Sequence, residues 1–332
     1  MKYMKFLLFF MFCYSSSIAQ NVIINGIPRD TSFTVHSAYV KALKNYPQIQ
    51  IVSPQLPENV REIENVTYST LKSGRNLNLN IYRPKNDEKY PALLMVHGGG
   101  WSSGDLSLQI PMAQRIASKG YVTVPVEYRL SPESQFPAAV FDLKIAIRWI
   151  RANAEIYGID TTKIAISGCS AGGQLAMLVG MTNFRPEYET PDEYASYNTN
   201  VHAVVNIDGI SDFSTEELTA TRESLAKNKM PASIKWLGGT YEDMKDTWIA
   251  ASPINHVTKD SAPVMFINSS IPRFHGGRDE IIEKLSAYNI YTEVYAFDDS
   301  PHPFWLFYPW FPTTVDRTVS FLDKVLKGKE NK

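Results

Sequence analysis

Residues 163–173 read KIAISGCSAGG, and this stretch decides what kind of fold the chain can form. Its first four residues predict a buried strand, and the apolar residues after Gly173 continue at helical spacing. Between them Gly168 and Gly172 flank Ser170, because so tight a strand–turn–helix connection has no room for bulky neighbours. Such a turn lifts the serine hydroxyl above the carboxyl edge of a sheet, at the positive end of the following helix.

Short apolar runs recur along the chain after residue 60 and are separated by amphipathic stretches. Unbroken apolar runs are typical of strands buried on both faces. Residues 142–157 carry apolar side chains at helical spacing, and Gly158 is the expected C-cap. Strands that alternate with helices predict the α/β class, with a mostly parallel central sheet and helices on both faces. The expected buried strands are 92–96, 121–124, 163–166, 201–207 and 264–267, and the alternating residues 77–82 predict a half-exposed edge strand.

A glycine-rich segment, His97–Trp101 (HGGGW), directly follows one of these expected strands. Three successive glycines leave backbone N–H groups that no side chain shields, and such groups can stabilise an oxygen that develops negative charge. The N–H of Ala171, beside the turn serine, would complete an oxyanion hole. A phosphate-binding loop is the alternative, but no lysine followed by serine or threonine comes after these glycines.

His302 follows the alternating residues 291–297 and lies in a loop late in the chain. A loop after the last strand can bring an imidazole to the sheet edge where Ser170 lies, within reach for general-base catalysis. A structural role is the alternative for any single histidine. The histidines for which we expect that structural role are His36, His202, His256 and His275.

Taken together, these motifs resemble the α/β-hydrolase superfamily. Within it the chain is similar to carboxylesterases with an HGGG oxyanion loop, especially the exported bacterial acetyl- and feruloyl-esterase-like carbohydrate esterases. The similarity spans roughly residues 65–326 and implies an α/β-hydrolase fold with lid or cap insertions. The segments that carry the resemblance are His97–Trp101, Glu127–Pro132, Gly168–Gly172, Ala251–Pro253 and His302.

The resemblance also implies roles for individual residues. Ser170 would be the nucleophile and His302 the general base, while the N–H groups of Gly99, Gly100 and Ala171 would bind the oxyanion. This assignment needs no metal and no cofactor, and the sequence contains no His/Asp cluster at metal-ligand spacing, which disfavours a metal-dependent deacetylase.

The acid that orients the imidazole has two candidates. In this family the catalytic histidine follows one strand of the sheet, and the aspartate that orients it follows the preceding strand. In most members this aspartate lies in an HGxxD motif. His275–Asp279 reproduces this motif, although well beyond the end of that strand, and predicts Asp279 as the acid. A helix N-cap is the structural alternative for Asp279. Asp208, at the end of the preceding expected strand, is the other candidate, because that strand end meets the same sheet edge.

Candidate substrate-binding residues lie near these catalytic positions. Aromatic faces pack against the apolar C–H faces of sugar rings, which makes Trp305 and Trp310, in an aromatic run after the histidine, candidates together with Trp101. Arg273 could pair a substrate carboxylate through its planar fork, as an acidic sugar would offer. Core packing and surface ion pairs are the alternative roles for these four side chains.

Composition excludes several other classes of protein. The chain has 332 residues, of which 44% are apolar, enough to bury a large core. Its 33 Lys and Arg residues balance 34 Asp and Glu residues, whereas a nucleic-acid binder would need a basic surface. With only 2 cysteines, the chain can form neither a disulfide framework nor a zinc cluster of thiolates.

The ends and interruptions of the pattern predict the domain organisation. Residues 1–19 combine two lysines, a short apolar run and a small-x-small site, which predicts a signal peptide and export to the periplasm or the medium, without stable membrane insertion after its removal. Residues 20–60 are expected to form an N-terminal arm. Residues 61–328 are expected to form one catalytic domain, with insertions at about 182–200 and 213–255 over one end of the sheet.

The motifs and the resemblance together predict a serine esterase that works through an acyl-enzyme. The expected substrate is a small acyl or methyl ester on a plant cell-wall polysaccharide, such as acetylated xylan or pectin. A generalist carboxylesterase or lipase for small lipophilic esters is the alternative. A non-catalytic sugar-binding protein on the same scaffold is disfavoured, because the serine, the histidine and the glycine loop are all present.

Overall fold

The centre of the protein is an eight-stranded sheet with the order β11-β10-β9-β8-β6-β7-β5-β4. The computed structural model describes residues 21–24, 26–191 and 194–329, so the expected signal peptide lies outside the described residues. Strands β7, β6, β8, β9, β10 and β11 run parallel, and β5 is antiparallel to its neighbours. The strands are β4 (Val60–Thr70), β5 (Asn76–Pro84), β6 (Tyr90–Val96), β7 (Val122–Val126), β8 (Ile159–Cys169), β9 (Ala203–Ile207), β10 (Val264–Asn268) and β11 (Thr292–Ala296).

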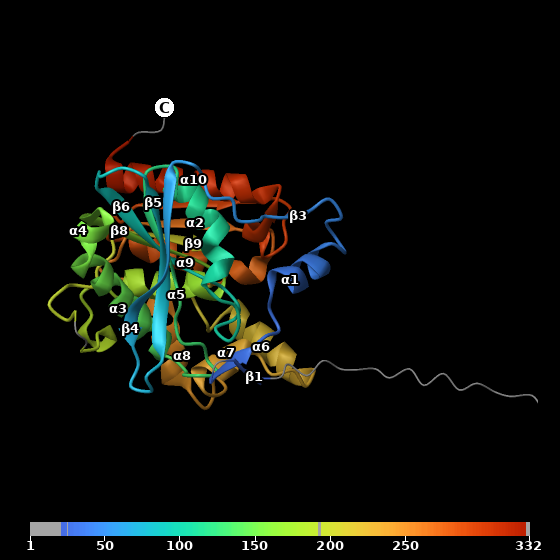
Figure 1. Ribbon diagram of the computed structural model, residues 1–332. Helices are drawn as coiled ribbons and strands as arrows, with labels where there is room; N and C mark the ends of the chain where they lie inside the picture. The colour runs from blue at the N-terminus through green and yellow to red at the C-terminus, as the bar shows by residue number, and fades with distance from the viewer. Residues whose placement is uncertain (1–20, 25, 192–193, 330–332) are drawn as a thin grey trace, which may run out of the picture.

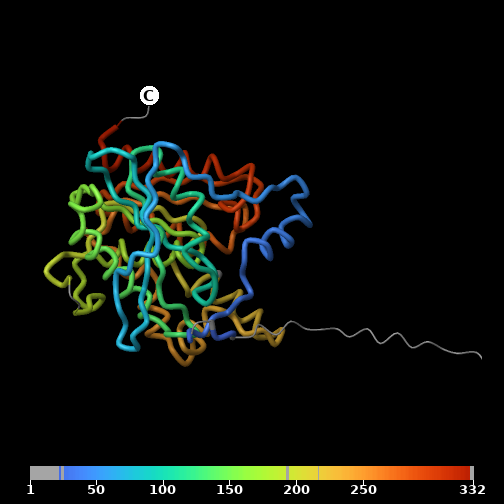
Figure 2. The backbone as a smooth tube through the Cα atoms, in the orientation of Figure 1, coloured from blue at the N-terminus to red at the C-terminus, as the bar shows by residue number. Residues whose placement is uncertain are grey.

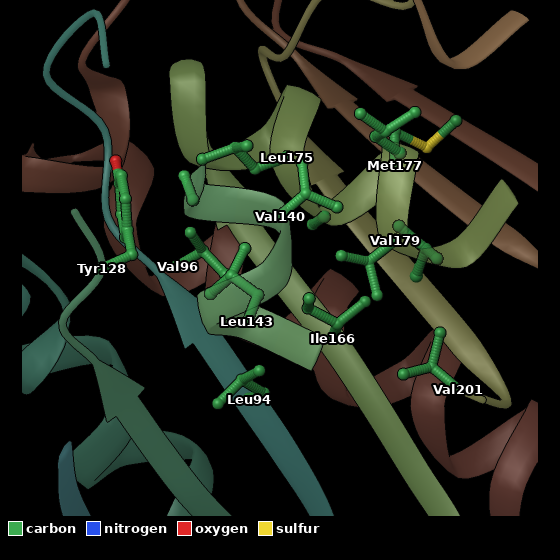
Figure 3. Packing of buried hydrophobic residues seen from close by; sticks show 14 of the residues in the cluster. Leu94, Val96, Tyr128, Val140, Leu143, Ile166, Leu175, Met177, Val179 and Val201 are labelled. Atoms are coloured by element: carbon green, nitrogen blue, oxygen red, sulfur yellow. The ribbon is translucent and has the colours of Figure 1, made fainter. Parts of the chain in front are cut away.

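Helices cover both faces of this sheet, as the alternating pattern predicts. Figure 3 shows side chains of α3 and α5 packed over those of β6 and β8, among them Leu143, Leu175 and Ile166. On the other face, Leu93 and Met95 contact a second core with α2 and α10, because successive strand residues point to opposite faces. The helices are α3 (Ala138–Ala152), α5 (Ala171–Met181) and α9 (Arg278–Ser286) on one face and α2 (Ile110–Ala117) and α10 (Trp310–Lys327) on the other.

The expected edge strand is not at the edge. Residues 77–82 belong to β5, which is largely buried, and the strand at this edge of the sheet is β4. The polar residues of the alternating pattern form hydrogen bonds with β4. Asn80 accepts a hydrogen bond from the Asn65 N–H at 2.9 Å, and Asn78 accepts one from the Thr67 hydroxyl. Asn80 is buried and Asn78 is partly exposed, so the alternation reflects strand pairing more than exposure to solvent.

The helix expected over residues 142–157 exists but is interrupted. Helix α3 ends at Ala152, and a short helix α4 (Ala154–Tyr157) follows it. At the junction the side-chain amide of Asn153 donates to the Trp149 carbonyl at 2.9 Å, in competition with the helical backbone. Gly158 ends α4 in the left-handed conformation (φ 61°), so the predicted glycine C-cap is confirmed.

The N-terminal arm, residues 21–59, lies along the outside of the sheet domain (Figure 2). It begins beside α7, crosses to the loop that carries His302, and pairs with a strand before α10. The Tyr46 hydroxyl donates to Asp299 at 2.8 Å. The arm contains β1 (Asn21–Ile24), β2 (Ile27–Asp30), α1 (Val35–Ala42) and β3 (Gln50–Ile51), and β3 pairs with β12 (Phe307–Tyr308).

The two expected insertions differ in position. Residues 213–255 form α6 (Glu216–Ala226), α7 (Ala232–Leu237) and α8 (Lys245–Ala251), which Figure 1 shows together at one end of the molecule, beside β1. Residues 182–200 instead attach to α3, where Lys144 and Arg148 pair with Glu189. None of the described helices combines the length and hydropathy needed to cross a bilayer.

Candidate active site

Ser170 lies in the turn between β8 and α5, with φ 56° and ψ −120°. The turn requires both flanking glycines. A Cβ on Gly168 would meet the Gly172 carbonyl oxygen at 2.0 Å, and a Cβ on Gly172 would meet the Val96 carbonyl oxygen at 2.3 Å. The strained backbone leaves the serine hydroxyl at the N-terminus of α5, where the helix dipole stabilises negative charge.

His302 and Asp208 complete a chain of hydrogen bonds with this serine. The Nε2 atom of His302 is 2.8 Å from the Ser170 hydroxyl oxygen, and its Nδ1 atom is 2.9 Å from Asp208 Oδ2. Asp208 is fully buried, and its other oxygen accepts a 2.7 Å hydrogen bond from the Ser269 N–H. Three residues far apart in sequence thus meet at the carboxyl edge of the parallel sheet.

The prediction that Asp279 orients His302 is wrong, and the alternative, Asp208, has this position. Asp279 lies in the first turn of α9 with 76% of its side chain exposed. There it accepts a hydrogen bond from Arg278, and this bond, together with the positive charge of Arg278, lowers the pKa of the carboxyl. The physical reason is the short 3-10 helix Pro272–His275, which lengthens the connection after β10 and carries the HGxxD motif past the sheet edge.

The glycine loop lies beside the serine, as predicted. Gly99 and Gly100 both have positive φ values, 126° and 59°, and line the same pocket as Ser170 and Ala171. Ser103 fixes the loop, because its N–H and its hydroxyl donate to the Gly99 carbonyl at 3.0 and 2.8 Å. In the described part of the chain, no hydrogen bond uses the N–H groups of the two glycines.

His97, the first residue of the glycine loop, is fully buried. Its ring stacks on Tyr128 with centroids 4.5 Å apart, and its Nδ1 atom is 2.8 Å from the Gly98 carbonyl oxygen. Burial lowers the pKa of His97 to about 4, so the ring is neutral at physiological pH. His97 therefore shapes the loop and does not face the reacting atoms.

The catalytic side chains open into a pocket of about 340 Å³. The Phe274 ring stacks on the His302 imidazole with centroids 3.4 Å apart, and the Trp305 ring is perpendicular to the imidazole with centroids 5.2 Å apart. Nine of the lining residues were not predicted from the sequence, among them Phe274, Glu217 of the inserted helix α6, and Phe33 of the arm. Phe274 immediately precedes the HGxxD motif His275–Asp279, and this position was its one available signal.

The four predicted substrate-binding residues divide into two groups. Trp101, Trp305 and Arg273 line the pocket. Trp101 is held by Trp236, on which it stacks at 4.9 Å. Trp310 is not among the lining residues; its Nε1 atom donates to the Asp299 carbonyl, and the residue is 7% exposed, so it is a packing residue. Within the described residues, no group of three or more His, Cys, Asp or Glu side chains is arranged to hold a metal ion.

Part of the chain that forms this site matches the model of a known family. The model of the BD-FAE family matches residues 79–293, more than half of the chain. The chain belongs to the BD-FAE family. The matched span includes the glycine loop, Ser170 and Asp208, whereas His302 and the N-terminal arm of this BD-FAE chain lie outside it.

Curated relatives of this BD-FAE protein are esterases by name. It is 34% identical to Esterase LipC of Mycobacterium tuberculosis over 210 residues, which cover 61% of this chain and 48% of that protein. It is 28% identical to the probable carboxylic ester hydrolase LipM of the same organism over 233 residues, or 69% of this chain and 51% of LipM. The chain thus spans about half the length of these relatives.

Solved structures share the fold of this BD-FAE chain. A truncated carbohydrate esterase from gut microbiota superposes with a TM-score of 0.69 at 21% identity, covering 82% of this chain and 99% of the other. Esterase 2 of Thermogutta terrifontis, phosphoramylated by tabun, gives 0.65 at 24% identity, covering 82% and 96%. At these identities the likeness establishes the α/β-hydrolase fold.

Proposed function

We propose that this chain is a serine esterase that hydrolyses carboxylic esters through an acyl-enzyme intermediate. The observation that carries the proposal is the pair of hydrogen bonds from Ser170 to His302 and from His302 to Asp208, beside a loop of bare backbone N–H groups. Nucleophile, base and orienting acid within hydrogen-bond reach of one another are the arrangement that nucleophilic acyl transfer requires.

The first half of the reaction makes the acyl-enzyme. His302 Nε2 takes the proton of the Ser170 hydroxyl as its oxygen attacks the ester carbonyl carbon. Asp208 keeps the Nδ1 proton in place and stabilises the imidazolium without taking that proton. The imidazolium then protonates the ester oxygen of the leaving alcohol, the carbon–oxygen bond breaks, and the acyl group stays on the serine.

The negative charge on the carbonyl oxygen needs stabilisation in both halves of the reaction. The N–H groups of Gly99, Gly100 and Ala171, which line the pocket with Ser170, are suited to this role. Loss of one such donor typically costs about 3–4 kcal/mol of barrier. In the second half, water gives its proton to His302 and attacks the acyl carbon, which releases the acid and restores Ser170.

For the substrate we propose a small acyl or methyl ester on a plant cell-wall polysaccharide, such as acetylated xylan or pectin, met by an exported enzyme. Trp101, Phe274 and Trp305 supply aromatic surface to the pocket, and a pocket of about 340 Å³ suits a small acyl group. The alternative is a generalist carboxylesterase for small lipophilic esters. The apolar side chains of Phe33 and Ile210 in the same pocket favour that alternative.

Ser170→Ala tests the proposed reaction. The substitution removes only the hydroxyl oxygen of a half-buried side chain and adds no volume, so the variant should fold and lose p-nitrophenyl acetate hydrolysis by at least about 10³-fold. A fluorophosphonate probe should label the unmodified protein once per chain, at Ser170, and should not label the variant. Unchanged hydrolysis by Ser170→Ala, or labelling at another residue, would refute the proposed mechanism.

A release assay separates the two substrate classes. Acetate and methanol are measured after incubation with acetylated xylan and methylated pectin, and kcat/KM is compared with that for p-nitrophenyl butyrate. Release from either polysaccharide that Ser170→Ala abolishes supports the carbohydrate ester. Efficient butyrate hydrolysis without release from either polysaccharide supports the generalist alternative.

A further inference from the structure

The inserted helix α6 presents a polar face to the pocket. Glu217, Ala220, Thr221 and Ser224 all line it, at the spacing that places residues on one face of a helix. Arg273 lines the pocket from the connection after β10. Besides His302 and Asp208, the ionisable side chains that line this pocket among the described residues are the carboxylate of Glu217 and the guanidinium of Arg273.

Glu217 and Arg273 form an ion pair with two hydrogen bonds. The Nε and Nη2 atoms of Arg273 donate to the same oxygen of Glu217, Oε2, at 3.0 and 2.7 Å. The Glu217 side chain is only 4% exposed, so its charge needs this partner, whereas that of Arg273 is 48% exposed. Within the described residues no hydrogen bond reaches the second carboxylate oxygen of Glu217, Oε1. This oxygen can therefore accept a hydrogen bond from a ligand.

The pair lies close to the catalytic histidine. The guanidinium carbon of Arg273 is 5.5 Å from the centre of the Phe274 ring, and that ring stacks on His302 at 3.4 Å. The Phe274 ring thus lies next to both the Arg273 guanidinium and the imidazole that would protonate the leaving alcohol. Of the two parts of an ester, the alcohol is the part placed to reach Glu217 and Arg273.

The charges of the pair decide what kind of alcohol fits. A substrate carboxylate would approach Arg273 next to the negative charge of Glu217, which already neutralises the guanidinium. The ion pair therefore disfavours the interpretation of Arg273 as a site for an acidic sugar. A free hydroxyl has no such penalty, because it can donate to the carboxylate and accept from the guanidinium, and bonds to charged groups are the stronger ones.

We propose that Glu217 and Arg273 form a hydroxyl-binding subsite, which selects esters whose alcohol is a neutral sugar with a free hydroxyl next to the ester. The inference rests on the proposed esterase function and narrows its substrate class. It favours acetylated neutral sugars over esters in which the neighbouring groups are uronic acids.

The test compares three esters: p-nitrophenyl acetate, a methyl xyloside carrying one acetyl group, and the equally acetylated methyl glucuronoside. The unmodified protein should prefer the xyloside to the charged glucuronoside by at least about ten-fold in kcat/KM. The readout for each variant is the kcat/KM for the xyloside divided by the kcat/KM for p-nitrophenyl acetate. Glu217→Gln should lower this ratio by about 10- to 100-fold, because the sugar hydroxyl then donates to a neutral amide oxygen instead of a charged carboxylate. Arg273→Lys, which keeps the charge but loses the fork, should lower the same ratio.

The matched control is Glu223→Gln, on the same helix, where the side chain is 67% exposed. This control should change neither the kcat/KM for the xyloside nor the kcat/KM for p-nitrophenyl acetate. If Glu217→Gln lowers both rates in parallel and leaves their ratio within about two-fold, the pair only braces α6 and the inference is wrong. A preference for the glucuronoside would also overturn it. If the unmodified protein hydrolyses none of the three esters and resists the fluorophosphonate, the esterase proposal itself fails, and the subsite fails with it.

Discussion

Replacing Asp208 by asparagine tests the orientation of His302 with the least change in shape. The asparagine oxygen can still accept the 2.7 Å hydrogen bond from the Ser269 N–H. Its amide nitrogen then takes the place of Oδ2, which is 2.9 Å from His302 Nδ1. An amide nitrogen donates, so the imidazole must accept at Nδ1 and carry its proton on Nε2. In that tautomer His302 can no longer take the proton of Ser170.

The size of the effect follows from the buried charge that is lost. Asp208 is fully buried against a histidine that becomes positive during the reaction. Two unit charges about 4 Å apart at an effective dielectric constant of about 20 interact by about 4 kcal/mol, or about 10³-fold in rate. The wrong tautomer adds to this loss, and the same substitution in a serine protease lowers kcat about 10⁴-fold. We therefore expect kcat to fall by about 10³- to 10⁴-fold.

The assay is the steady-state hydrolysis of p-nitrophenyl acetate at neutral pH, with thermal unfolding to verify that each variant is folded. The control is Asp279→Asn, whose side chain is 76% exposed and which should keep kcat within about two-fold. A loss of less than about ten-fold in a folded Asp208→Asn variant, or a larger loss in Asp279→Asn, would refute the assignment of the acid.

Two further predictions concern residues that surround the catalytic centre. Phe33→Ala opens the pocket on the side of the arm, so kcat/KM for p-nitrophenyl butyrate should rise relative to the acetate by about ten-fold; an unchanged ratio would remove Phe33 from substrate selection. His97 binds a proton at about pH 4 in the folded protein and at about 6.5 in the unfolded chain. The unfolded chain therefore holds the extra proton between these values, and stability falls by up to about 3 kcal/mol as the pH drops through that window. Urea unfolding of His97→Phe at neutral and acidic pH should lack this component, and an identical pH dependence in both proteins would contradict it.

Local sequence was sufficient to predict the parts of the site that depend on local structure. The turn around Ser170 depends on Gly168 and Gly172, where a Cβ would clash with the backbone. Both glycines can be read directly from the sequence. The glycine loop follows a strand directly, and His302 follows one closely. In each case the strand and the residues after it determine where the group lies.

The acid and the polar wall depend on distances that one sequence does not contain. Both Asp208 and Asp279 follow strands of the same sheet, and only the length of the helical turn after β10 decides which of them meets the imidazole. Glu217 lies on an inserted helix whose apolar residues mark no clear face, so nothing in the sequence indicated that it turns toward the pocket. Tertiary packing determines both positions.

The N-terminal arm has a consequence for how substrate range can change. It reaches the glycine loop, where the Asp30 N–H donates to the Ser102 carbonyl at 3.3 Å, and the histidine loop, through Tyr46 and Asp299. Between these ties Phe33 lines the pocket, although the family match begins only at residue 79. Exchanging this arm between homologues would therefore change which esters fit the pocket and leave Ser170, His302 and Asp208 in place.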